Sequence, residues 1–194
     1  MEFFDHPAVD ELKPFFRYLG KNWLRVKEAA GDLTESEQFL LGGAGEALLQ
    51  HIENELNPAK SYKMAVLSSL VEKEADAEGW GIDEIARDFK KFYLQNRRYL
   101  ADYTEMARSS NPNDYPVSKV RSHLIKMPLN YLADNEHKFF RLDTGEGKFY
   151  LKKGEDGVNH RLWNQPDFKM LLRDRITYAL KTYFYRKEKQ VIIR

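Results

Sequence analysis

The chain has 194 residues, of which 42% are hydrophobic and none is cysteine. This length makes one domain of ordinary size or two small ones, with enough apolar residues to bury a core, which excludes disorder of the whole chain. The lack of cysteine excludes disulfides, thiolate metal sites and a cysteine nucleophile.

The net charge of +1 hides an uneven distribution of charge along the chain. Residues 1–60 hold 6 Lys and Arg against 11 Asp and Glu, and residues 61–90 hold 4 against 7. Residues 91–194, in contrast, hold 21 against 12. Such asymmetry indicates a region that faces a polyanion, attached to an acidic one.

The first residues lack the basic and apolar regions of a secretory signal. No stretch approaches the roughly 18 apolar residues of a membrane span. We therefore expect a cytoplasmic protein with no membrane partner.

The acidic first segment, residues 1–58, is predicted to be helical. Apolar residues recur at spacings of three and four over residues 7–30, the pattern of one helix face. Thr34 and Glu37 have the spacing of a capping box and predict the start of a second helix. The glycine-rich residues 42–45 could cradle a phosphate, but the Lys-Ser/Thr that follows a phosphate loop is missing. A helix break or close helix packing is therefore the preferred interpretation.

A second region, residues 59–155, begins where a proline coincides with a change of pattern. Ser61 is expected to cap a buried helix over residues 62–71. Residues 80–94 are strongly periodic and predict another helix, whose polar side carries cations that could contact phosphates. An ordinary solvated face explains these cations equally well. They are Arg87, Lys90, Lys91, Arg97 and Arg98.

Residues 101–116 have the composition of a loop. Helix formation resumes after Pro116, with Ser118 as the candidate N-cap. Pro128 either ends this helix or lies in the first turn of a further one, residues 129–133.

A hairpin is predicted next, because strand-favouring residues 137–143 and 148–153 flank the glycine-containing residues 144–147. Phe140 and Leu142 fall on one face of the first strand, which can pack on helices, and the other face offers Lys and Arg to solvent. Two helices, a basic third segment and a hairpin, in this order, are the layout of a winged helix.

Four segments of this region also suggest a family. They are Ser61-Tyr62-Lys63-Met64-Ala65-Val66-Leu67, Ile82-Asp83-Glu84-Ile85-Ala86 with Phe89 and Phe92-Tyr93-Leu94, Lys126-Met127-Pro128-Leu129 with Leu132, and the Phe-rich hairpin. Over about residues 59–153 the chain resembles the C-terminal accessory region of bacterial superfamily II DEAD/DEAH-type helicases. The chain has no motor motif, so the resemblance implies an accessory domain or a stand-alone relative without ATPase activity. It also implies a helicase partner, in a system of phage defence or restriction.

The preferred functional interpretation is non-catalytic binding of DNA or another nucleic acid. In this arrangement a helix enters the major groove and wing lysines contact backbone phosphates. Arg121 is the best candidate for pairing with base edges, and Asn130 is a second one if the short helix after Pro128 is the reader. The candidate binding residues are Lys119, Arg121, Lys126, Asn130, Lys138, Arg141, Lys148, Lys152 and Lys153.

The last segment, residues 156–194, is predicted to form a basic helix that packs back on the winged helix or on a partner chain. Its aromatic residues Tyr178, Tyr183, Phe184 and Tyr185 are many to bury in one chain, which favours self-association as a homo-oligomer or docking. Interleaved with Lys and Arg, they could instead stack on unpaired bases, although core packing is the more frequent role.

The predicted fold is therefore mainly α-helical: an N-terminal helical segment, a winged-helix-like domain with one β-hairpin, and a C-terminal helix. Two other functions stay open. The winged helix could dock a partner protein, which would make the chain an adaptor. Glu146 and Lys148, with Asp134 and Asp143, could form a magnesium-dependent nuclease site, although a glycine-flanked turn holds carboxylates loosely. The five histidines never pair at one-turn spacing, so we expect no metal site. We also expect no cofactor and no enzymatic activity.

Overall fold

The computed structural model describes residues 22–54, 56, 60–108, 111–133, 139–152 and 158–192, with side chains as far as Lys187. The protein is mainly helical with a small antiparallel sheet, which confirms the predicted fold class. By its internal packing the chain divides into two compact units, Met1–Asn57 and Pro58–Arg194. Within the described ranges, no helix is long and apolar enough to cross a membrane.

The first unit holds, in its described residues, α2 (Trp23–Ala30), α3 (Glu35–Leu40) and α4 (Ala44–Asn54). Asn22 caps α2, because its side-chain oxygen accepts a hydrogen bond of 3.0 Å from the N–H of Leu24. The predicted capping box of α3 is confirmed: Thr34 Oγ1 accepts from the N–H of Glu37, and the Glu37 carboxylate accepts from the N–H of Thr34. The part of the predicted 7–30 helix before Asn22 lies outside the described residues.

The second unit holds the remaining elements. Its α-helices are α5 (Tyr62–Val71), α6 (Ile82–Gln95), α7 (Leu100–Ala107), α8 (Val117–Leu124), α9 (Asn130–Leu132), α10 (His160–Trp163) and α11 (Pro166–Ile192). Two 3-10 turns and a π turn connect some of them: η2 (Arg97–Tyr99), η3 (Pro112–Asp114) and η4 (Ile125–Leu129). The strands are β1 (Trp80–Gly81), β2 (Phe140–Asp143) and β3 (Lys148–Leu151).

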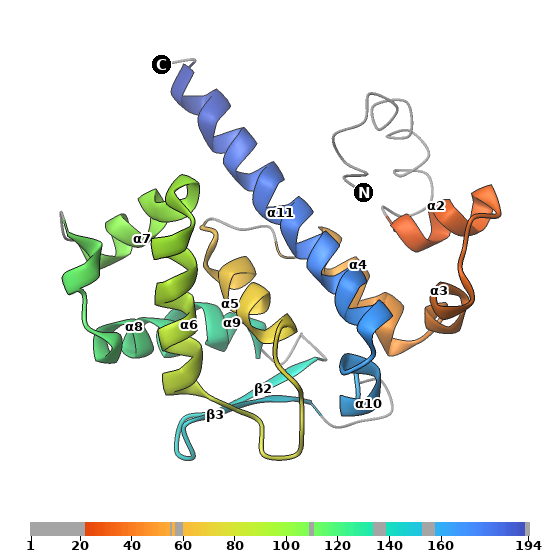
Figure 1. Ribbon diagram of the computed structural model, residues 1–194, viewed down its shortest axis with the longest axis horizontal. Coiled ribbons are helices and arrows are strands. Elements are labelled where there is room, and N and C mark those ends of the chain that lie inside the picture. The colour runs from red at the N-terminus through yellow and green to blue at the C-terminus, as the bar shows by residue number, and fades with distance from the viewer. Residues whose placement is uncertain are drawn as a thin grey trace. The chain divides into compact units, whose positions relative to one another are not determined.

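The order of these elements gives the second unit a winged-helix-like layout. Helix α5, strand β1, helix α6 and the helix that begins with α8 are followed by the β2–β3 hairpin, and β3 is the central strand of the sheet. Phe140 pairs with Leu151 and Asp143 with Lys148, so residues 144–147 close the hairpin as predicted. In Figure 1 the hairpin lies below α5 and α9, and α6 stands beside them.

Helix α5 is the centre of the second unit. It packs against α6 on one side and α11 on the other, and Figure 1 shows the blue α11 running alongside the yellow α5. Met64, Ala65, Val66 and Leu70 are inaccessible to solvent. The sequence places apolar residues on most sides of this helix, and the two neighbouring helices bury them.

Four aromatic rings join the sheet to α10. Phe140 and Phe149 stack across the two strands of the hairpin at 5.2 Å between centroids, and Trp80 lies 5.3 Å from Trp163 of α10. All four side chains are at least 95% buried. The hairpin thus packs on the helices through the Phe140 face, as the alternation along β2 predicts.

The prediction that residues 80–94 form one helix is wrong at its first two residues. Trp80 and Gly81 form β1, which pairs antiparallel with Phe149 and Lys148 of β3. Gly81 has an extended backbone and precedes the first turn of α6. Since pairing with a distant strand decides the conformation of Trp80, local periodicity could not reveal it.

The prediction of a loop over residues 101–116 is also wrong. Helix α7 occupies the first half of this stretch and η3 lies in the second. Asp102 and Tyr103 are completely buried, which requires an ordered backbone. Turn-forming residues around Asn111 and Pro112 favoured a loop over the whole stretch, so the helix before them was not predicted.

Two predicted helix caps are wrong. Ser61 makes no side-chain cap to α5, because its hydroxyl and its N–H both donate to Asp102. Ser118 lies inside the first turn of α8, for which Pro116 is the N-cap residue. In both cases the serine lies at the expected helix start, but its hydroxyl does not cap it.

Candidate nucleic-acid interface

The basic third segment is one continuous helical stretch, residues 117–132, made of α8, η4 and α9 and called below the 117–132 helix. Val120, Leu124 and Leu132 are buried, which fixes the inward face. Ser118, Lys119, Ser122, Lys126, Met127, Asn130 and Tyr131 are exposed. No Asp or Glu occurs between residues 117 and 133. The outward face of this helix is therefore polar and positively charged, apart from its last turns.

The prediction that Pro128 either ends this helix or lies in the first turn of a further one is wrong. It lies buried inside the π turn η4, and the helix continues through Asn130 to Leu132. Proline lacks the N–H that an α-helical turn needs, and a wider turn accommodates the missing bond and the ring. Lys126 and Asn130 thus belong to the same helix as Lys119.

Arg121 does not extend freely from this helix. Its Nε lies 3.2 Å from Oδ1 of Asp83, in the first turn of α6. A Cβ added at Gly147 would lie 3.6 Å from an Arg121 amino group, so the guanidinium also lies against the hairpin turn. Arg121 joins helix, hairpin and α6, which leaves Lys119, Lys126 and Asn130 as the outward groups.

His123 faces inward. Its ring meets the ring of Tyr62 edge-on at 5.1 Å, and its Nε2 is buried without a hydrogen-bond partner. Burial lowers the pKa of His123 below its ordinary value, so the imidazole is neutral at neutral pH. It adds no positive charge to the outward face.

Most of the described charged side chains of the hairpin contact other groups of the protein. Arg141 lies over the ring of Tyr150 at 4.3 Å and within 3.4 Å of the Asp143 carboxylate, and Lys148 donates to the carbonyl oxygen of Gly79. Lys152 is exposed at the end of β3. The other two predicted wing residues, Lys138 and Lys153, lie outside the described residues.

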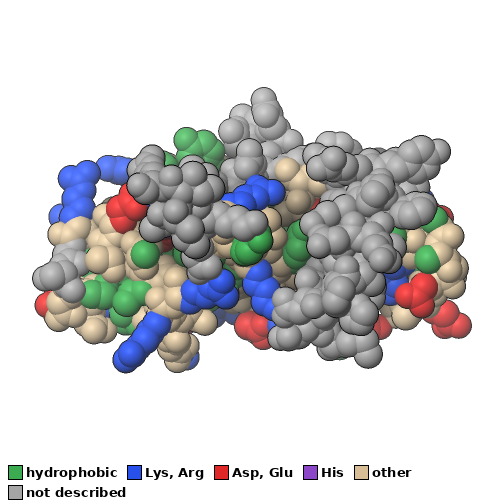
Figure 2. Space-filling model, turned by 90° about the horizontal axis from the view of Figure 1, so that it is seen from above, with side chains coloured by type: hydrophobic (Ala, Val, Ile, Leu, Met, Phe, Trp, Pro, Cys, Tyr) green, Lys and Arg blue, Asp and Glu red, His purple; other side chains and the backbone are tan. Residues whose placement is uncertain are grey.

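The cations of α6 serve different purposes. Lys90 donates to the carbonyl oxygens of Asn113 and Tyr115 and so holds the η3 segment against α6. Arg87 and Lys91 are exposed. On the face drawn in Figure 2, Lys and Arg side chains stand singly or in small groups among hydrophobic and other side chains. Among the described residues visible there, they do not merge into one basic surface.

A buried polar cluster around Asp102 was not predicted from the sequence. The Asp102 carboxylate accepts from the N–H and the hydroxyl of Ser61 at 2.9 and 2.6 Å, from Tyr183 at 3.2 Å and from Lys187 at 2.5 Å. The Ser61 hydroxyl also pairs with Tyr93 at 2.7 Å. The cluster joins α5, α6, α7 and α11. No local motif marks it, because its members are far apart in the sequence.

A cleft of about 300 Å³ lies between α5, the end of α6 with η2, and α11. Glu72 and Arg173 close its rim with two hydrogen bonds of 2.7 and 2.9 Å. Phe92, Ile176 and Leu180 supply apolar walls. The charges of Glu72 and Arg173 neutralise each other.

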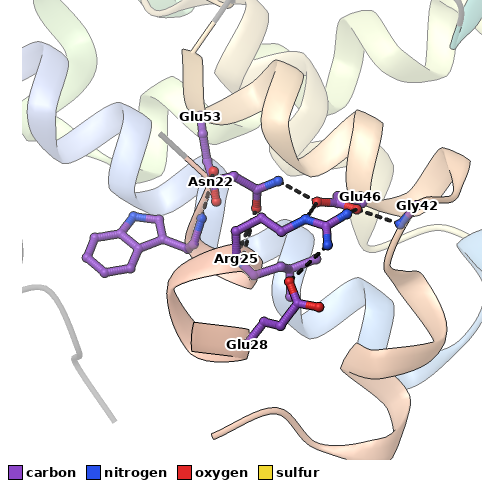
Figure 3. Close-up of polar contacts among 8 residues, drawn as sticks. Asn22, Arg25, Glu28, Gly42, Glu46 and Glu53 are labelled. Atoms are coloured by element: carbon purple, nitrogen blue, oxygen red, sulfur yellow. Dashed lines mark hydrogen bonds and ion pairs between the residues drawn. The ribbon is translucent and has the colours of Figure 1, made fainter. Parts of the chain in front are cut away.

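In the first unit, the glycine-rich turn before α4 holds an anion that belongs to the chain itself. The Glu46 carboxylate accepts from the N–H of Gly42 at 2.6 Å, from Asn22 at 2.6 Å and from Arg25 at 2.7 and 2.8 Å, as Figure 3 shows. Burial raises the pKa of Glu46, but these bonds outweigh it and hold the pKa below its usual value. The turn separates α3 from α4, which is the helix break that the sequence indicates as one of two interpretations.

The carboxylates considered for a nuclease site are engaged in the hairpin. Glu146 accepts from the hydroxyl of Tyr150, and Asp143 accepts from the N–H of Glu146 at 3.0 Å. Asp134 lies outside the described residues. The described ranges contain no group of three His, Cys, Asp or Glu side chains placed to hold a metal ion.

Comparison of the chain with protein-family models, with curated proteins and with solved structures finds no match.

Proposed function

We propose that the protein binds duplex DNA, without catalysis, through the outward face of the 117–132 helix. The observation that carries this proposal is the charge of that face: Lys119 and Lys126 are exposed there, and no acidic residue occurs over residues 117–133. Phosphates supply most of the attraction between a protein and DNA, and lysines on one helix face are suited to contact them.

The geometry of the second unit supports this role. Inward residues hold the helix on α6 and α5, and the ion pair of Arg121 with Asp83 ties it to the hairpin side of the unit. The rigid scaffold leaves Asn130 on the exposed surface, and an asparagine amide can pair with an adenine edge in the major groove. Lys152 at the end of the hairpin would contact a neighbouring phosphate.

The test is binding of the purified full chain to a fluorescently labelled duplex, measured by anisotropy over a salt series. A Lys119→Ala/Lys126→Ala variant should bind more weakly, and its slope of log affinity against log salt should fall by about 2, since each phosphate contact contributes about 0.9. The matched control is Arg161→Ala/Arg186→Ala, which removes two exposed cations from other helices.

The proposal fails if the wild type does not bind at low salt, or if both double variants lose the same affinity. If the wild type does not bind, the adaptor function, in which the same face docks a partner protein, replaces DNA binding as the proposal. The helicase partner, the homo-oligomer and the link to phage defence or restriction stay predictions.

A further inference from the structure

A small aromatic surface lies at the end of the 117–132 helix. Tyr131 is 50% exposed and Met127, one turn earlier, is 42% exposed. Lys63 of α5 places its ammonium group 6.0 Å from the centre of the Tyr131 ring. Large hydrophobic side chains so exposed are few among the described residues, and these two are adjacent on one helix.

Lys63 is itself unusual. It is half-buried, and burial lowers the pKa of its ammonium group. In the described part of the chain it makes no ion pair with a carboxylate, and its neighbour is the face of Tyr131. A partly desolvated cation without a counter-ion is unfavourable, and an anion from a ligand would relieve that cost.

We propose that Tyr131, Met127 and Lys63 form a site for one unpaired nucleotide next to the bound duplex. The base stacks on the ring of Tyr131 and against Met127, and its phosphate contacts Lys63. This inference rests on the proposed function and extends it from duplex DNA to DNA that contains a single-stranded interruption.

The chemistry of the surface favours a nucleotide over a protein partner. An apolar protein surface would cover Tyr131 and Met127 but would also bury Lys63 without an anion. The surface that two side chains expose is also far smaller than the roughly 800 Å² that each partner buries in a stable protein interface. A nucleotide brings a flat ring and a negative charge together, which matches an aromatic face with the Lys63 ammonium group beside it.

The site also discriminates between paired and unpaired bases. Within a duplex both faces of a base are covered by its neighbours, so a side chain on the protein surface cannot stack on it. A gap in one strand frees the opposite base to turn outward, and stacking on an aromatic ring is tolerant of sequence. The expected specificity is therefore for structure and not for base identity.

The experiment compares an intact duplex with the same duplex carrying a central gap of a few nucleotides in one strand, so that both have identical ends. The wild type should bind the gapped DNA about five- to twentyfold more tightly, the gain typical of one stacked base. Tyr131→Ala should abolish this preference and leave affinity for the intact duplex within about twofold, whereas Tyr131→Phe should retain it because the ring is kept. Phe39→Ala, at an exposed aromatic side chain of the first unit, is the control and should change neither affinity.

A fluorescent purine analogue opposite the gap gives an independent readout, because its emission should change on binding wild type and Tyr131→Phe but not Tyr131→Ala. Equal wild-type affinity for the two DNAs, or equal loss on both in Tyr131→Ala, would overturn the inference. If Lys119→Ala/Lys126→Ala still weakens duplex binding in that case, the proposed function survives alone. If neither DNA binds, both proposals are rejected and a protein partner becomes the explanation of the exposed Tyr131 and Met127 side chains.

Discussion

Asp102 shows how one buried carboxylate can organise a helical unit. Its side chain is inaccessible to solvent and accepts from Ser61, Tyr183 and Lys187. Burial raises the pKa of Asp102, but the bonds from Lys187 and Ser61 outweigh that effect and hold the pKa below its usual value. The charged form is therefore the stable one in the folded protein.

Replacing this carboxylate should destabilise the fold. Asp102→Asn removes the charge that neutralises Lys187 and turns an amide group toward the donors of Ser61, which should cost about 2 to 4 kcal/mol in the free energy of unfolding. Urea denaturation of wild type and Asp102→Asn at pH 7 measures this difference in the free energy of unfolding. Lys187→Ala is the comparison variant, and it should cost less because Lys187 is partly exposed.

The same residue predicts a dependence on pH. Because the folded-state pKa of Asp102 lies below the unfolded-state value of about 4, its contribution is complete above that value and is lost as the pH falls through the folded-state pKa. The stability difference between wild type and Asp102→Asn should thus be constant above about pH 5 and shrink below about pH 4. A difference that grows on acidification would contradict this role.

At the scale of elements, Gly79 decides how β1 meets the hairpin. Its φ of +65° is left-handed, and an added Cβ would lie 2.4 Å from the ring of Tyr150 and 2.8 Å from the carbonyl oxygen of Phe149. Gly79→Ala should therefore cost about 3 kcal/mol, from backbone strain and the clash together. Thermal and urea unfolding measure the loss.

Gly145 in the hairpin turn supplies the matched control. A Cβ there would make an ordinary contact of 3.5 Å with the Asp143 carboxylate. Gly145→Ala should change the free energy of unfolding by less than about 1 kcal/mol. Similar losses in the two variants would show that the close approach of Gly79 to the hairpin does not limit stability.

Some elements of the fold could be predicted from the sequence and others could not. Helices α5 and α6 and the hairpin followed from periodicity and turn glycines, because these signals are local. The β1 strand did not, since Trp80 adopts its conformation by pairing with Phe149, far along the chain. Arg121 was the favoured reader of bases, but its ion pair with Asp83 depends on the packing of two helices. Lys119, Lys126 and Asn130 are exposed on the 117–132 helix, opposite the buried Val120 and Leu124.

At the scale of the whole molecule, the two units carry opposite charges. Residues 58–194 hold 26 Lys and Arg against 19 Asp and Glu, whereas residues 1–57 hold 5 against 11. The proposed DNA contacts lie entirely in the second unit, whose core of α5, α6 and α11 is internal to it. The acidic unit therefore repels the polyanion to which the basic unit is attracted.

Removing residues 1–57 should consequently strengthen DNA binding. The remaining chain has a net charge of +7, from 26 Lys and Arg against 19 Asp and Glu, and should bind a duplex about tenfold more tightly at low salt. The advantage should vanish above about 0.5 M salt, where screening leaves only close contacts. Circular dichroism checks that the shortened chain keeps its helices. Weaker binding by a folded shortened chain would mean that the first unit contributes contacts of its own, and that the acidic charge does not govern association.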